Sequence, residues 1–120
     1  MAIHYQTEVH GNLLKVITTG EDESLEEVMK YAHTIINEAV KSGIIKVLCD
    51  ERNLIWKLST FDTFQLAEDT SMLAPKVAKI AIVCNAKYVE EGRFYETVAT
   101  NRGLAIRVLS DIDEAERWLE

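Results

Sequence analysis

Charged side chains follow a strongly apolar segment near the middle of the chain. Asp50, Glu51 and Arg52 come directly after residues 44–49, which read IIKVLC. A carboxylate at such a point can orient a ligand, or it can accept hydrogen bonds from its own turn and pair with a nearby arginine. The sequence therefore indicates Asp50 and Arg52 as candidate binding residues, with local capping or pairing as the structural alternative.

Two hydroxyl side chains stand a few residues further on. Ser59 and Thr60 open a predicted helix, where hydroxyl groups cap backbone amides and where anions bind. Ser59 is thus a candidate for phosphorylation as well as for capping. Ligands of open α/β sheets bind beyond the carboxyl ends of the strands. The predicted loop between residue 49 and the helix that starts at Ser59 is short. We therefore expect Asp50, Arg52, Ser59 and Thr60 to border one surface at the carboxyl end of the strand.

The segment from residue 54 to residue 66, which includes Ser59 and Thr60, is unusually apolar. Seven of the thirteen residues from 54 to 66 are large and apolar: Leu54, Ile55, Trp56, Leu58, Phe61, Phe64 and Leu66. One helix face does not bury them all against a sheet, so the segment forms core, a surface for a second chain, or an apolar ligand pocket. Trp56 and Phe61 are the candidate anchors of a homodimer or a partner surface, because aromatic side chains dominate such contacts.

Other common site chemistries are not indicated. The three histidines, at positions 4, 10 and 33, lack the spacing of metal ligands, and no glycine-rich phosphate loop or nucleophile motif is present. We therefore expect no metal, no cofactor and no enzymatic activity. Cys49 and Cys84 each end an apolar run, so we expect buried, reduced thiols rather than a redox pair.

The elements that position these residues follow from periodicity. Alternation over residues 3–9 and a turn at Gly11-Asn12 predict a hairpin with residues 13–19, and residues 20–23 are expected to form a polar loop. A capping box at Ser24 predicts a helix that ends at Gly43. Apolar runs predict buried strands at residues 44–49, 80–84 and 104–109, with helices at 59–74, 88–102 and from Asp111.

This order predicts an α/β fold in one domain, residues 1–120, with a mostly parallel sheet, an antiparallel hairpin at the start and four helices. The formal net charge of −7 disfavours nucleic acid and anionic membranes as partners. The first residues lack a signal peptide, and no apolar run reaches the ~20 residues of a membrane span. A cytoplasmic location without integral membrane association is therefore expected.

The sequence resembles the STAS domain of bacterial anti-sigma-factor antagonists, and more closely the SpoIIAA-like family of small proteins. The first 43 residues share only the pattern of elements. The segments that carry the resemblance are residues 47–52 (VLCDER), 77–83 (VAKIAIV), 93–96 (RFYE), 101–103 (NRG), 108–109 (VL), 113–115 (DEA) and 118–119 (WL).

This resemblance implies a non-enzymatic regulatory or protein-interaction module. Regulatory STAS domains are phosphorylated on a serine at the start of the second helix, and Ser59 occupies that place here. The related SEC14-like domains bind lipids, which makes a carrier or sensor of a small apolar ligand the alternative function. A large cavity under residues 54–66 would favour the ligand hypothesis, and an apolar interface between two copies there would favour the interaction module.

Overall fold

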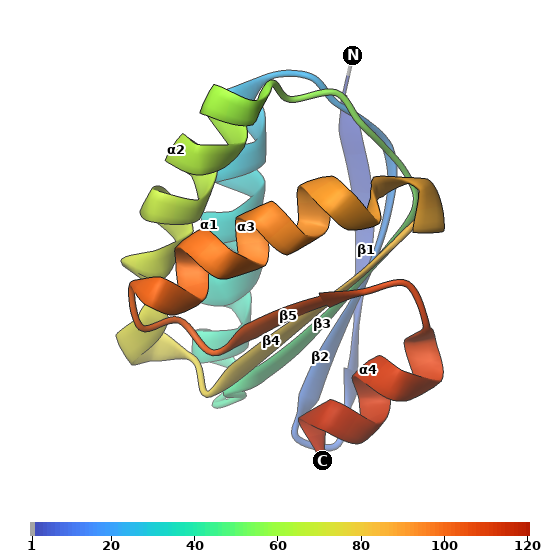
Figure 1. Cartoon of the computed structure of the whole chain (residues 1–120). Helices are drawn as coiled ribbons and strands as arrows, with labels where there is room; N and C mark the ends of the chain where they lie inside the picture. Colours follow the sequence, from blue (N-terminus) through green and yellow to red (C-terminus); the bar gives the residue numbers. More distant parts are fainter. Residues whose placement is uncertain (1) are drawn as a thin grey trace.

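The computed structural model describes residues 2–120 and has the expected order of strands and helices (Figure 1). Two short 3-10 helices, Ala74–Lys76 and Ala86–Tyr88, follow α2 and β4. The main elements are β1 (Ile3–His10), β2 (Leu13–Asp22), α1 (Leu25–Lys41), β3 (Lys46–Trp56), α2 (Thr60–Ser71), β4 (Lys79–Cys84), α3 (Val89–Asn101), β5 (Ile106–Leu109) and α4 (Ile112–Leu119).

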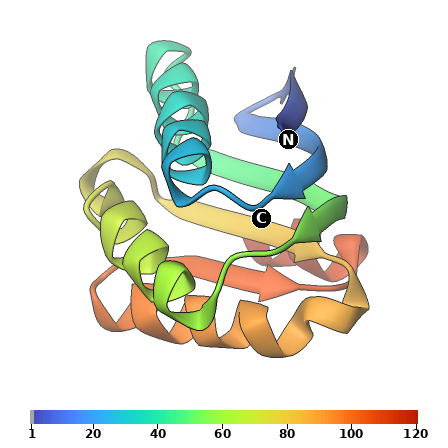
Figure 2. The same ribbon diagram turned by 90° about the horizontal axis from the view of Figure 1, so that it is seen from above.

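The five strands lie in the sheet in the order in which they occur in the chain. β1 and β2 pair antiparallel and all later neighbours pair parallel, as predicted. Right-handed crossovers that always advance in one direction place their helices on the same face of the sheet. α1, α2 and α3 accordingly share one face, and α4, which follows the last strand, lies on the other (Figures 1 and 2).

The sheet separates two apolar cores. The larger core joins α1, α2 and α3 to inward-facing strand residues such as Val16, Val47 and Ile80. The smaller core joins α4 to residues on the opposite face, including Leu48 and Ala81. Neighbouring residues on one strand belong to different cores because successive side chains point to opposite faces.

β2 and β3 both extend further than the sequence indicates. The expected polar loop at residues 20–23 is wrong, since β2 continues to Asp22 and pairs Glu21 with Ile55 and Asp22 with Trp56. The expected loop after residue 49 is also wrong, because β3 runs on to Trp56. Polar residues are poor strand signals, but a ladder that continues between two long strands satisfies their backbone groups whatever their side chains.

Helix α1 begins as predicted but differs in detail. The Ser24 hydroxyl accepts a hydrogen bond from the Glu27 amide, at 3.3 Å. The Glu27 carboxylate does not return to Ser24 as a capping box requires; it accepts from the Ile3 amide at 2.9 Å. The apolar spacing of residues 25–40 predicts a buried stripe that includes Val40 and not Tyr31, but Tyr31 is 7% exposed and Val40 is 47% exposed.

Replacing Ser24 with alanine should lower the free energy of unfolding by about 1 kcal/mol, because a lost N-cap hydrogen bond costs about that much. Urea denaturation measures the change. Thr34→Ala is the control, since Thr34 is an exposed residue of the same helix whose hydroxyl bonds only the Lys30 carbonyl. Equal midpoints for Ser24→Ala and the parent protein would show that the cap contributes nothing.

Candidate functional site

A cavity of about 110 Å³ lies between the sheet and the helices α1, α2 and α3. Its wall is mainly apolar and includes Ile35 from α1, Leu54 from β3 and Leu66 from α2. α2 packs chiefly against α1 and α3 instead of lying directly on the strands, which leaves space beneath it. The cavity thus lies under residues 54–66, where the apolar excess of the sequence is found.

Strand β3 directs a carboxylate into this apolar space, because Val47, Cys49 and Glu51 alternate onto the helix side, and a β-bulge follows it. Ile17 pairs with Asp50, but Thr19 pairs with Asn53, so β3 contains one extra residue at this point. The extra residue shifts the alternation of side chains. As a result Glu51 and Leu54, three residues apart, both line the cavity.

Glu51 is almost completely enclosed, with 6% of its surface exposed. Its Oε2 accepts a hydrogen bond from the Tyr31 hydroxyl at 3.0 Å, and the Tyr31 oxygen lies 2.7 Å from the Thr18 hydroxyl. Within residues 2–120, no basic side chain pairs with it. Burial raises the pKa of Glu51 from 4.5 to about 7, although the Tyr31 hydrogen bond opposes this shift.

A second buried carboxylate, Asp22, lines the cavity at the end of β2 and is 7% exposed. It accepts a hydrogen bond from the backbone amide of Lys57 at 2.6 Å, which ties the segment after β3 to β2. Burial raises the pKa of Asp22 to about 6, although backbone hydrogen bonds to its carboxylate act to lower it. This position differs from the polar loop that the sequence predicts for residues 20–23.

The indole of Trp56 lies beside these carboxylates. Its ring stacks on Tyr88, with ring centroids 5.4 Å apart and planes 15° from parallel. Its Nε1 is buried and has no hydrogen-bond partner among the described residues. The N–H lies near enough to the Glu51 carboxyl group to favour a lower pKa there, but outside the geometry of a hydrogen bond. A buried donor without a partner is costly unless a ligand or water satisfies it.

Asp50 and Arg52 lie on the face of the sheet opposite the cavity. Asp50 accepts two hydrogen bonds from the Arg52 guanidinium, both at 2.8 Å, and these hold the pKa of Asp50 below its usual range. The local pairing considered for them is therefore the arrangement in the structure. Ser59 and Thr60 belong to α2, on the other face, so the predicted single surface containing all four residues is wrong.

The remaining predicted residues lie at the start of α2. The Ser59 hydroxyl is exposed and accepts from the Asp62 amide at 3.1 Å, which is the capping role. Thr60 is exposed as well, and Phe61 is 67% exposed. A role for Ser59 in phosphorylation stays a prediction. Trp56 and Phe61 do not form one surface patch, because Trp56 lines the cavity and Phe61 faces solvent.

The sequence did not indicate the buried carboxylates Asp22 and Glu51 or the neighbouring Tyr31, nor four further polar residues that line the cavity: Thr63, Thr70, Glu91 and Tyr95. Tyr31 lies three residues after Val28 and four before Ile35, so its spacing carried a usable signal although the predicted stripe did not include it. The two buried carboxylates carried none, since each sits in a run of charged residues that is typical of solvated surface. Among the described residues, no group of three or more histidines, cysteines or carboxylates is placed to hold a metal ion.

Both cysteines are free and buried. Burial raises the pKa of the Cys49 thiol well above its ordinary value, with the Glu51 carboxylate adding to the effect, and it raises the pKa of Cys84 to about 11. Since only thiolates react rapidly, we expect both to resist labelling. Titration with a thiol reagent should show slow modification in the native protein and two rapid equivalents in urea. Rapid native labelling of either residue would contradict the prediction.

Comparison with solved structures identifies the fold. An uncharacterized protein of the DUF3478 family from Shewanella loihica PV-4, described as SpoIIAA-like, superposes with a TM-score of 0.60 at 18% identity, over 99% of this chain and 94% of that one. The chain has a SpoIIAA-like fold. It is also similar to an anti-sigma factor antagonist from Mycobacterium paratuberculosis, with a TM-score of 0.64 at 14% identity, covering 98% and 94% of the two chains.

A third SpoIIAA-like structure is the anti-sigma factor antagonist SpoIIAA in its unphosphorylated form, with a TM-score of 0.55 at 10% identity and 96% of each chain covered. No protein-family model matches the sequence, and no curated protein matches it. At these identities the comparisons establish the SpoIIAA-like fold, which confirms the resemblance in architecture. None of the helices among residues 2–120 is long and apolar enough to cross a membrane.

Proposed function

We propose that this chain is a non-enzymatic regulatory module that binds a small, mostly apolar ligand in the cavity beneath α2. The observation that supports this function is the cavity itself, which lies under residues 54–66 and contains an unpartnered indole N–H and a nearly enclosed carboxylate. Binding sites of this kind combine apolar walls with a few oriented polar groups. An engineered apolar cavity of about 150 Å³ holds benzene, so this smaller space suits a ligand of a few heavy atoms.

The position of α2 favours a regulatory use of such binding. Leu58, Thr63 and Leu66 line the cavity from the α2 side, while Phe61 on the same helix faces solvent. A ligand that changes the position of α2 would therefore change the outer surface of the protein. Regulation requires such a difference in contacts between the free and the bound state. A cytoplasmic location, expected from the sequence, is part of this proposal.

The polar groups of the cavity favour binding over catalysis. Cys49 is the strongest potential nucleophile of the cluster, but burial and the adjacent Glu51 keep its thiol protonated. A catalytic site needs a nucleophile, a base within reach and donors for the developing charge. Asp50 and Arg52 do not supply such a set, because these two groups pair with each other on the opposite face.

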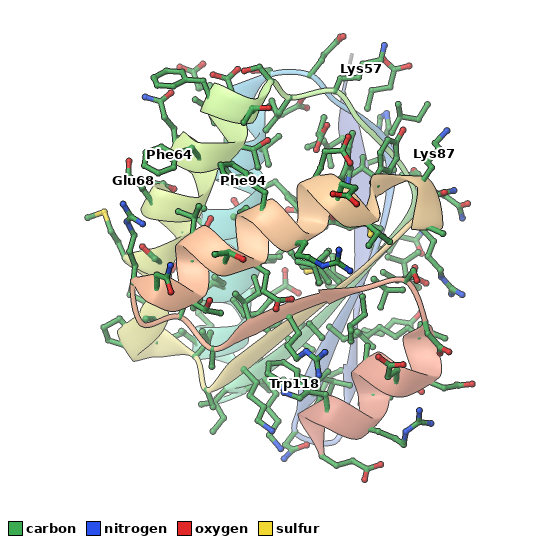
Figure 3. The ribbon with its side chains drawn as sticks, viewed as in Figure 1. Lys57, Phe64, Glu68, Lys87, Phe94 and Trp118 are labelled. Atoms are coloured by element: carbon green, nitrogen blue, oxygen red, sulfur yellow. The ribbon has the colours of Figure 1, made fainter. Side chains whose placement is uncertain are left out.

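A titration with 1-butanol tests the ligand site, followed by the indole N–H signals of the two tryptophans in NMR spectra. The Trp56 signal should shift and saturate, whereas the Trp118 signal should not, because Trp118 belongs to α4 on the other face (Figure 3). Ala32→Leu fills the cavity from α1 and should abolish the shift. Asn37→Leu, on the exposed side of α1, should leave it unchanged. No saturable shift at Trp56 would refute the proposed function.

Protein interaction through the outer surface of α2 and α3 is a second candidate function. Two of the fold's relatives are anti-sigma factor antagonists by name. Phe61 and Phe94 are 67% and 38% exposed on this surface, and Phe64 lies under the Arg102 guanidinium, 5.3 Å from ring centroid to Cζ (Figure 3). Exposed aromatic residues of this kind anchor partners or a second copy of the chain.

Sedimentation at high micromolar concentration tests self-association through this surface. We expect a dimer for the parent protein and a monomer for Phe61→Ala, since truncating an aromatic anchor costs about 2 kcal/mol or more of binding free energy. Ile55→Ala is the control, because Ile55 is 42% exposed on the face opposite α2. A monomeric parent protein would exclude homodimerisation at this concentration.

A further inference from the structure

Among the described residues, the ionisable groups that line the cavity are all acidic, without a basic side chain among them. Its lining includes three carboxylates, Asp22, Glu51 and Glu91, and no lysine, arginine or histidine of residues 2–120. The other ionisable side chains that line it are two tyrosines and one cysteine, whose ordinary charged forms are also anions. The whole chain has a formal net charge of −7, which attracts cations to it.

Glu51 has one oxygen available to a ligand. Tyr31 donates to Oε2, and no described group donates to Oε1 within hydrogen-bond geometry. A buried carboxylate without a positive partner is expensive to ionise. A cation that enters the cavity therefore gains more favourable electrostatic free energy from this carboxylate than the same cation gains from a carboxylate at the surface. An alkylammonium group offers three donors on one atom, which suits Oε1 of Glu51 and the nearby Asp22 carboxylate.

We propose that the ligand of this cavity is a small aliphatic amine, bound as its ammonium cation with the charge at Glu51 and the alkyl chain against the apolar wall. This inference rests on the proposed function, because it names the chemical class of the ligand for the same cavity. The apolar wall selects a hydrocarbon body, and the volume of about 110 Å³ limits its size. By comparison with benzene in about 150 Å³, roughly four carbon atoms fit.

Several titratable groups surround Glu51 and determine how binding responds to pH. They come from five elements, Asp22 from β2, Tyr31 from α1, Cys49 and Asp50 from β3, Cys84 from β4, and Glu91 and Tyr95 from α3, whereas the described α2 residues that line the cavity are not titratable. Only Asp22 and Glu51 have raised carboxyl pKa values, about 6 and about 7. Between about pH 5 and pH 8 both lose their protons, while an alkylamine, similar to lysine at about 10.4, stays protonated.

The test is a titration with n-butylamine, 1-butanol and butyrate, which share a chain and differ in the polar group. At about pH 8 we expect n-butylamine to bind at least about tenfold more tightly than 1-butanol, and butyrate not to bind, because the charged groups of the cavity at this pH are all carboxylates. The Trp56 indole signal reports binding, and Trp118 serves as the internal reference. At about pH 5 the advantage of the amine should fall by at least about tenfold, since Glu51 is then neutral.

Glu51→Gln separates the inference from the proposed function. It keeps the shape of the side chain and an acceptor for Tyr31 but removes the charge, so butylamine should bind it no better than butanol does. Asp50→Asn is the matched control on the other face and should bind butylamine as the parent protein does. Equal binding of amine and alcohol by the parent protein would overturn the amine inference and leave the ligand site intact. Failure of both probes to bind would overturn both proposals.

Discussion

Glu51→Gln should make the protein more stable at about pH 8, by about 3 kcal/mol, and leave its stability nearly unchanged at about pH 4. The estimate follows from a carboxyl pKa raised from 4.5 to about 7 by burial, at about 1.4 kcal/mol for each pKa unit. Glutamine has the same shape and still accepts from the Tyr31 hydroxyl, so it removes the cost of ionisation without removing the hydrogen bond.

The direction of this effect follows from proton binding. Because the folded state binds the Glu51 proton more tightly than the unfolded state does, stability from this group is complete below pH 4.5. It falls as pH rises from 4.5 to about 7 and is constant above that value. Asp22, with its pKa raised to about 6, contributes with the same sign in a lower window.

Urea denaturation of the parent protein and Glu51→Gln at several pH values measures the difference directly. Asp50→Asn supplies a contrast of opposite sign, because Arg52 lowers the pKa of Asp50 and its ionised form therefore stabilises the fold at neutral pH. If the difference between Glu51→Gln and the parent protein does not change with pH, Glu51 does not titrate as a buried group and the electrostatic account of the cavity is wrong.

Leu54→Ala should cost about 2–5 kcal/mol of unfolding free energy, as large-to-small changes of buried leucines do. Leu54 is 3% exposed and lines the cavity from β3. Its truncation also enlarges the cavity, so we expect a bulkier probe such as benzylamine to bind this variant more tightly than it binds the parent protein. The matched change is Leu48→Ala, also on β3 but fully buried in the core under α4.

The two leucine variants should lose comparable stability and differ in binding. Leu48→Ala opens space on the opposite face of the sheet, so its affinity for n-butylamine and benzylamine should match that of the parent protein. Denaturation gives the stability cost, and the Trp56 indole signal gives the affinities. Tighter benzylamine binding by Leu48→Ala than by Leu54→Ala would show that the ligand space does not lie beneath α2.

Local patterns in the sequence were sufficient for the order of the elements and for the hairpin at the start. The apolar stripe of α1, its cap at Ser24 and the apolar strand runs predicted those segments, because each depends on residues close together in the chain. The apolar excess of residues 54–66 also indicated that this segment has more apolar side chains than one helix face buries against a sheet. The excess did not decide whether these side chains form part of the core, an interface or a ligand pocket, since an apolar side chain suits all three.

The tertiary structure alone decided what the site is. Asp22 and Glu51 look like surface residues in the sequence, and Asp50 and Arg52 look like the better candidates. The pairing of β3 with β2 continues the strand past residue 49, so that alternation keeps Glu51 on the helix side with Val47 and Cys49 and leaves Asp50 on the other face. The bulge that follows brings Leu54 to the same side as Glu51. The sequential strand order then places α1, α2 and α3 on one side, so the cavity forms there. Register and strand order depend on pairing between distant segments, which local residue patterns do not encode.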